Sequence, residues 1–224
     1  KIKTCSILLD LRDIWPESAV VLGGIKSKWL IKMGRWLEAK VYDAVSGFIF
    51  PVPGFSNYFK ESFPEQLDKP MFSLMNGIDS EFLMELDSTN KNFNNSFTVL
   101  YSGNMGIAQG LEVVIETAEM LANYPINFQF IGDGVNKQSL IDLTKSKGIK
   151  NVLFQNPLPR NQLIQEMKKA NVCLVPLKNK KLFKSAIPSK IFEIMACSKP
   201  IILGVKGEAA EIIKQNNCGT VVLP

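Results

Sequence analysis

The chain has 224 residues, of which 46% are hydrophobic, and a formal net charge of +5. It is long enough to bury one large core or two small ones, and it is less basic than a dedicated nucleic-acid-binding domain, so we expect no nucleic-acid partner. The chain contains no histidine, which excludes histidine triads, histidine general bases and most zinc sites. No signal peptide and no membrane-spanning apolar run is visible, and scattered cysteines favour reduced thiols, so we expect a cytoplasmic protein.

The first part of the chain combines short apolar runs with one long helix. Apolar runs of strand length are predicted at Thr4–Leu11, at 47–53 and from residue 69 up to Asn76, and short helical turns at 55–63. Asn76-Gly77 is a turn signal that ends the third of these runs. The asparagine-rich segment 88–96 predicts a surface loop.

Residues Ile25–Val45 have the periodicity of an amphipathic helix. The apolar positions that fall on one side are Trp29, Leu30, Met33, Leu37, Val41 and Val45, and the basic residues are Lys26, Lys28, Lys32, Arg35 and Lys40. Basic and aromatic residues together favour an interfacial helix on anionic lipid, and hence a peripheral membrane contact. The alternative is an ordinary surface helix whose tryptophans pack on the core.

From Phe97 onward, apolar strands alternate with helices in short steps. This pattern predicts an α/β fold, a Rossmann-like parallel sheet with helices on both faces. Ligands of such sheets bind beyond the carboxyl ends of the strands, so each loop that follows a strand is a candidate.

The loop Gly103-Asn104-Met105-Gly106 follows the first of these strands. Its glycines permit close approach of the backbone to an anionic ligand, although a tight turn without a ligand explains them equally well. We interpret Gly132-Asp133-Gly134 as a turn. Exposed backbone near Asn156 and Leu158 could pair with a heterocycle edge, or the two prolines there could make a rigid connection.

A later helix begins near Pro188 and carries Ser189, Lys190 and Glu193. A lysine at a helix start is electrostatically unfavourable unless an anion such as a diphosphate lies beside it. An ionised Glu193 accepts hydrogen bonds and suits the hydroxyls of a ribose. The alternative is a solvent-facing Lys/Glu pair three residues apart.

The order "YSGNMG", "FIGDG", "PSKIFEIMACSKPII" and "GEAAEII" resembles the carboxyl-terminal half of retaining, family 4 glycosyltransferases of the GT-B fold. The likeness is to bacterial O-antigen and capsule enzymes, including N-acetylfucosamine transferases. "NGID" resembles the hinge of that family, and "LLDLRDIWPES" resembles part of its amino-terminal half. The resemblance implies two domains: the remainder of an amino-terminal, acceptor-side domain at 1–75, and a nucleotide-sugar-binding domain at 76–224. The resemblance implies that only part of an amino-terminal half is present here.

The resemblance also implies roles for individual residues. Glu193 would hold the ribose, the loop from Gly103 to Gly106 would line the diphosphate, and Ser189 with Lys190 would start the helix that caps it. The donor-sugar acid of the family is replaced by Ser185, and its cations in and after the glycine loop are missing. Lys190, Lys184 or Arg12 could supply the charge. Arg12 and Asp13 stand near the place of the family's catalytic histidine, or form a structural pair at a strand end.

We therefore predict a retaining transferase that moves a hexose or N-acetylhexosamine from a nucleotide sugar, UDP-linked, to a glycan or lipid-linked acceptor. Its catalytic candidates are Arg12, Asp13 and Ser185. We expect no cofactor and no metal, because acids with ligand spacing do not occur. Two alternatives are a nucleotide-binding module without turnover and a nucleotide-sugar epimerase, against which the lack of histidine argues.

Overall fold

The structure is a computed structural model that describes residues 5–87 and 96–223. The chain forms two compact units: Lys1–Asn76 with Lys180–Ile187, and Gly77–Asn179 with Pro188–Pro224. No sequence pattern predicted that residues 180–187 belong to the first unit. The predicted functional boundary at 75/76 stays a prediction, and the expected loop at 88–96 lies almost wholly outside the described residues.

The first unit is built on a three-stranded parallel sheet in the order β1-β2-β3. Its elements are β1 (Leu8–Asp10), α1 (Glu17–Val21), α2 (Lys28–Ala44), β2 (Gly47–Phe50), α3 (Pro53–Ser62), the 3₁₀ turn Pro64–Gln66 and β3 (Met71–Ser73). The long helix and the three strands confirm the predicted order. The first strand is shorter than predicted, because residues 5–7 have no strand pairing among the described residues.

The core of the first unit is aromatic. Tyr42 of α2 meets the rings of Phe48, Phe59 and Phe63 edge-on, with centroids 4.9–5.6 Å apart, a favourable geometry for aromatic pairs. Leu182, in the 3₁₀ turn Lys181–Ser185, packs against this cluster together with Ile187. Burial of these two side chains explains why residues 180–187 belong to the first unit.

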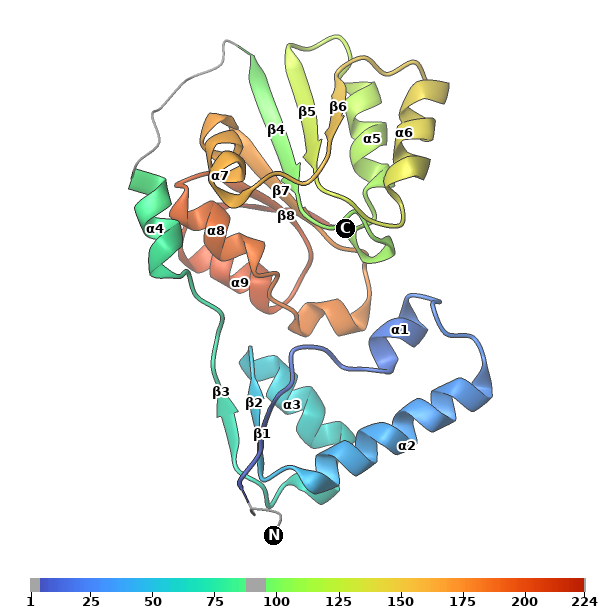
Figure 1. The fold of residues 1–224 in the computed structure, drawn as a ribbon. Coiled ribbons are helices and arrows are strands. Elements are labelled where there is room, and N and C mark those ends of the chain that lie inside the picture. Colours follow the sequence, from blue (N-terminus) through green and yellow to red (C-terminus); the bar gives the residue numbers. More distant parts are fainter. Residues whose placement is uncertain (1–4, 88–95, 224) are drawn as a thin grey trace. The chain divides into compact units, whose positions relative to one another are not determined.

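The second unit is a six-stranded parallel sheet in the order β6-β5-β4-β7-β8-β9. Its elements are α4 (Ser80–Asp87), β4 (Phe97–Ser102), a 3₁₀ turn (Ile107–Gln109), α5 (Glu112–Met120), β5 (Ile126–Ile131), α6 (Lys137–Ser146), β6 (Val152–Gln155), α7 (Arg160–Lys169), β7 (Val172–Pro176), α8 (Lys190–Ala196), β8 (Ile201–Gly204), α9 (Glu208–Gln215) and β9 (Gly219–Val221). The predicted alternation of strand and helix is confirmed. Figure 1 shows α5 and α6 on one side of the sheet and α7 and α8 on the other.

The strand order reverses between β4 and β7, which are neighbours in the sheet. From β4 the chain moves outward through β5 to β6, and from β7 it moves the other way through β8 to β9. In open α/β sheets, the carboxyl edge at such a reversal of strand order is where ligands usually bind. A hydrogen bond of 2.8 Å from Lys178 N–H to the Ala108 carbonyl ties the loops after β4 and β7 together.

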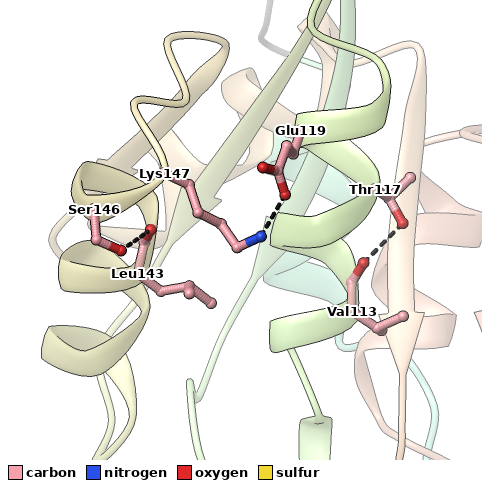
Figure 2. Close-up of polar contacts among 6 residues, drawn as sticks. All are labelled: Val113, Thr117, Glu119, Leu143, Ser146 and Lys147. Carbon is pink, nitrogen blue, oxygen red and sulfur yellow. Dashed lines mark hydrogen bonds and ion pairs between the residues drawn. The ribbon is translucent and has the colours of Figure 1, made fainter.

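The helices α5 and α6 lie side by side over one core cluster (Figure 2). Lys147 Nζ bridges them through an ion pair of 2.5 Å with Glu119, and this carboxylate raises the pKa of Lys147. Thr117 Oγ1 bonds to the Val113 carbonyl within α5. Because exposed ion pairs contribute little, the packing of α5 rests mainly on its buried residues Val114, Ile115 and Ala118.

Ile115→Ala should lower the free energy of unfolding by about 2–5 kcal/mol, because it empties space in a close-packed core. Ile115 is fully buried, whereas Val113 on the same helix is 56% exposed. Val113→Ala is therefore the matched control, and we expect a change within about 0.5 kcal/mol. Urea denaturation followed by circular dichroism measures both, and equal losses would contradict this account of the core.

Candidate functional site

Two glycine loops interlock at the carboxyl edge of the sheet, one after β4 and one after β5. A Cβ on Gly132 would lie 2.0 Å from the Gly103 carbonyl oxygen, and one on Gly134 would lie 2.5 Å from the Asn104 side-chain oxygen. Gly103, Gly132 and Gly134 also have φ angles of +119°, +147° and +151°, in a region that residues with a side chain rarely adopt. Glycine is required here by the contact between the loops.

Most backbone N–H groups of the loop after β4 already have partners. Those of Gly103 and Met105 donate to the carbonyls of Ile131 and Asp133, at 2.9 and 2.7 Å. The Gly106 N–H donates to Gln109 Oε1 at 3.0 Å. Asn104 is exposed, and its N–H makes no hydrogen bond within the described residues. The loop can thus present the Asn104 N–H to an anion more readily than the N–H groups of its glycines.

Lys190 brings a cation to this loop. Its Nζ donates to the Ser102 carbonyl at 2.7 Å and lies 4.4 Å from the centroid of the buried Tyr101 ring. The Tyr101 hydroxyl in turn donates to the Asn104 carbonyl at 2.5 Å. A Cβ on Gly103 would stand 2.9 Å from Nζ. Burial lowers the pKa of Lys190 to about 8, and the Glu193 carboxylate partly opposes that shift.

Glu193 is a half-buried carboxylate with no hydrogen bond or ion pair among the described residues. Its charge raises the pKa of Lys190 and, as a minor contribution, that of Arg160. Arg160, the first residue of α7, pairs with Asp79 at 2.6 Å and stacks over Phe82. Glu193 is therefore an available acceptor within the electrostatic reach of two cations.

The start of α8 offers less than the sequence led us to expect. The helix has seven residues, Ser189 makes no side-chain cap, and the N–H groups of Ile191 and Phe192 donate to the carbonyls of Pro188 and Ser189. A short helix has a weak macrodipole, and two of its first N–H groups are occupied. The cation at this edge is therefore the side chain of Lys190 rather than the helix terminus.

Asn156 and Leu158 lie in the loop after β6. The Asn156 side-chain oxygen accepts from Lys137 Nζ at 2.8 Å, and the same amino group bonds to the Gly132 and Gln155 carbonyls. Leu158 is half-buried. Lys137 thus joins the loops after β5 and β6, a role that the sequence did not reveal.

Arg12, Asp13 and Ser185 belong to the first unit by packing, whereas the residues from Gly103 to Asn156, with Ser189, Lys190 and Glu193, belong to the second. Arg12 is exposed and pairs with Asp10 at 2.8 Å, so its structural partner is Asp10, where the sequence suggested Asp13. Their catalytic roles stay predictions.

Two cavities lie apart from the glycine loop. One of about 290 Å³ in the first unit is lined partly by Glu17, Arg35 and Glu38. Another, of about 380 Å³, is lined partly by Asn127 and Asn151, which lie at the starts of β5 and β6, at the amino edge of the sheet. Among residues 5–87 and 96–223 no three His, Cys, Asp or Glu side chains form a metal-ligand group, and the expectation about metal stays a prediction.

The comparisons with known proteins define the class. The family model "Glycosyl transferases group 1" matches residues 85–224, and the chain belongs to that family. Solved structures share the fold: WaaG, a glycosyltransferase involved in lipopolysaccharide biosynthesis, has a TM-score of 0.70 and 16% identity over 96% of this chain and 61% of its own. HepE of Anabaena, solved with UDP and glucose, has a TM-score of 0.69 and 15% identity, covering 98% of this chain and 58% of that one. These are glycosyltransferases of the GT-B fold, which confirms the predicted fold class.

Two curated proteins are similar in sequence to part of this chain. The putative colanic acid biosynthesis glycosyl transferase WcaI of Escherichia coli K12 is 33% identical over 102 residues, which are 46% of this chain and 25% of that protein. The probable glycosyltransferase WbjE of Pseudomonas aeruginosa is 31% identical over 116 residues, 50% of this chain and 28% of its own. The matched segments thus span about a quarter of each relative.

Gly132→Ala should displace the Gly103 loop, because the new methyl group would stand 2.0 Å from the Gly103 carbonyl oxygen. Gly148→Ala is the matched control: it also has a positive φ, +64°, but nothing lies within 4 Å of its Cβ position. We expect Gly148→Ala to lower the free energy of unfolding by about 1–2 kcal/mol, and Gly132→Ala by roughly 2 kcal/mol more. Urea denaturation measures both free energies of unfolding, and equal decreases in the two variants would show that the loops do not interlock.

Proposed function

We propose that this protein is a glycosyltransferase that binds a nucleotide-sugar donor, UDP-linked, in its second unit. The observation that carries the proposal is the presence of Lys190 and Glu193 on α8, with Lys190 beside the Gly103 loop at the carboxyl edge where the strand order reverses. A cation next to a tight backbone loop suits a diphosphate, and an acceptor one turn farther along the helix suits a ribose. Membership of the group 1 family and the UDP-bound fold neighbour support this proposal.

In this proposal Lys190 is the diphosphate clamp. The resemblance left open whether Lys190, Lys184 or Arg12 replaces the two cations that the family usually has in and after the glycine loop. Lys190 is the cation that contacts the backbone of the loop, through the Ser102 carbonyl. Together with the Asn104 N–H, its ammonium group would neutralise charge that develops on the leaving diphosphate. This arrangement needs no metal, and we propose none.

Glu193 accepts the ribose hydroxyls, and Arg160 is a further cation near it. Arg160 already pairs with Asp79 and packs on Phe82, so it stays fixed when the nucleotide binds. Asn156 and Leu158 border the base, and their backbone would read its edge. Ser189 lies at the mouth of the diphosphate site.

For the whole enzyme we propose transfer, with retention, of a hexose or N-acetylhexosamine such as N-acetylfucosamine to a glycan or lipid-linked acceptor at the cytoplasmic face of the membrane. Arg12, Asp13 and Ser185 remain the catalytic candidates. Release of UDP from UDP-sugars, measured with and without a polyprenyl-diphosphate glycan acceptor, tests turnover. Nucleotide binding without any UDP release would leave a binding module.

Glu193→Ala should weaken UDP binding by about 1.5–3 kcal/mol, the range for hydrogen bonds to a charged group. Isothermal calorimetry at constant pH and salt measures this effect. Glu116→Ala is the control, since Glu116 is an exposed acid on α5 and its loss should leave affinity unchanged. Unchanged affinity in Glu193→Ala would remove Glu193 from the site.

UDP affinity should fall as pH rises above about 8, the lowered pKa of Lys190 in the free protein. A bound diphosphate favours the protonated amine, so binding above that pH takes up a proton and weakens by up to about tenfold per pH unit. The terminal phosphate of UDP, with a pKa of about 6, is already ionised there. Calorimetry from pH 7 to 9.5 in two buffers measures both affinity and proton uptake.

Lys190→Arg should bind UDP with a flat profile over this range, because a guanidinium stays protonated. Lys190→Met should bind weakly at every pH. A wild-type profile that matches Lys190→Met would contradict the clamp. The same low pKa predicts that the fold gains stability as pH rises from about 8 to 10.5, because the unfolded chain then binds more protons.

A further inference from the structure

The helix α2 already packs on the first unit with one of its faces. Gly34 and Tyr42 are its buried residues. A Cβ on Gly34 would lie 3.1 Å from the ring of Trp15, and the Tyr42 ring meets Phe48 at 5.6 Å. The face with Gly34 and Tyr42 therefore holds α2 on the first unit, and the other faces of the helix are not needed for this packing.

The opposite face of α2 is apolar and exposed. The exposed fractions of its apolar side chains run from 40% to 68%: Trp29 68%, Leu30 42%, Met33 45%, Trp36 61%, Leu37 50% and Val41 40%. Spacings of three, four and seven residues place them in one stripe along the helix, which is roughly 25 Å long. The two tryptophans do not pack on the core, so that interpretation of the sequence is wrong.

The charges beside this stripe are mainly basic. Lys28, Lys32 and Lys40 are exposed and form no ion pair within the part of the chain that the structure describes. Lys32 and Lys28 stand four and eight residues before Trp36, on the same row of the helix.

The other charged groups of α2 face different partners. Arg35 pairs with Glu17 at 3.0 Å, Glu38 accepts from the Tyr42 hydroxyl, and Asp43 accepts from Gln66. Arg35 is thus tied to α1 and does not contribute to the exposed stripe. The exposed charges beside the stripe are thus Lys28, Lys32 and Lys40 with one acid, Asp43, in the last turn of the helix, so the border of the stripe has a net positive charge.

We propose that this face of α2 binds the surface of an anionic lipid membrane. Tryptophan rings favour the headgroup level, leucine, methionine and valine side chains enter the acyl boundary, and lysines extend to the lipid phosphates. No helix among the described residues is long and apolar enough to cross a membrane, so the contact is an interfacial one.

The charge also decides between lipid and a second copy of the chain. Two copies meeting through this face would bring lysines against lysines, and like charges at an interface are unfavourable. An anionic bilayer instead complements both the apolar stripe and its basic border.

The test is flotation of the 224-residue chain with vesicles of phosphatidylcholine and phosphatidylglycerol, compared with phosphatidylcholine alone. We expect binding to the anionic vesicles at low salt, weaker binding as salt rises, and a blue shift of tryptophan emission on binding. No binding to anionic vesicles at low salt would overturn the proposal.

Matched variants sharpen this test. Lys28→Glu/Lys32→Glu should lower the partition coefficient at least roughly 25-fold, since each basic residue near an anionic surface contributes about fivefold. Lys145→Glu/Lys150→Glu changes the net charge equally at exposed positions of the second unit and should keep binding. Equal losses in the two double variants would overturn the proposal, because attraction would then depend on net charge alone.

A second variant, Trp29→Ser/Trp36→Ser, tests the apolar stripe. It should abolish the fluorescence shift and most vesicle binding while its thermal melt stays that of the wild type. If the wild-type chain instead dimerises in sedimentation and this variant is monomeric without any vesicle binding, a second copy covers the face. UDP calorimetry on the α2 variants should be unchanged, so failure here is distinct from failure of the nucleotide site.

Discussion

The hydrogen bond from Lys190 Nζ to the Ser102 carbonyl is the contact on which the candidate site depends. It joins residues 88 positions apart in the chain and holds α8 against the end of β4. A partly buried ammonium group is unfavourable unless carbonyls and ring faces compensate it. Here the Ser102 carbonyl, the Tyr101 hydroxyl at 3.4 Å and the Tyr101 ring do so. One N–H of the ammonium group is left for an anionic ligand, and burial lowers the pKa of Lys190 to about 8.

That contact exists only because the backbone around it is closely packed. The Gly103 carbonyl fills the space where Gly132 would carry a side chain, and Gly134 abuts Asn104 and Met105. Reversal of strand order beside β4 brings these loops to the same edge as α8. The glycines are therefore required for the packing between the loops, and this packing fixes the loop backbone before any ligand binds.

The residues of the candidate nucleotide site and those of the exposed stripe lie in different units. The family match, at residues 85–224, falls on the second unit and contains Lys190, Glu193 and the glycine loops. The first unit, apart from residues 180–187, lies outside that match and carries the exposed stripe of α2. The proposed nucleotide site and the proposed membrane contact thus rest on separate sets of residues, and variants can disturb one without the other.

By itself the sequence determined the alternation of strand and helix, the parallel sheet and the position of the glycine loop, because periodicity and glycine placement are local properties. It also marked Lys190 and Glu193 by their spacing on one helix. Only the tertiary structure decided which N–H groups the loop has left to offer, that Arg160 and Lys137 stand at the same edge, and that Arg12 pairs with Asp10. It also decided that Trp29 and Trp36 face outward, since the helical period gives a face but not what covers it. Hydrogen-bond partners and burial depend on residues distant in the chain, and no local pattern encodes them.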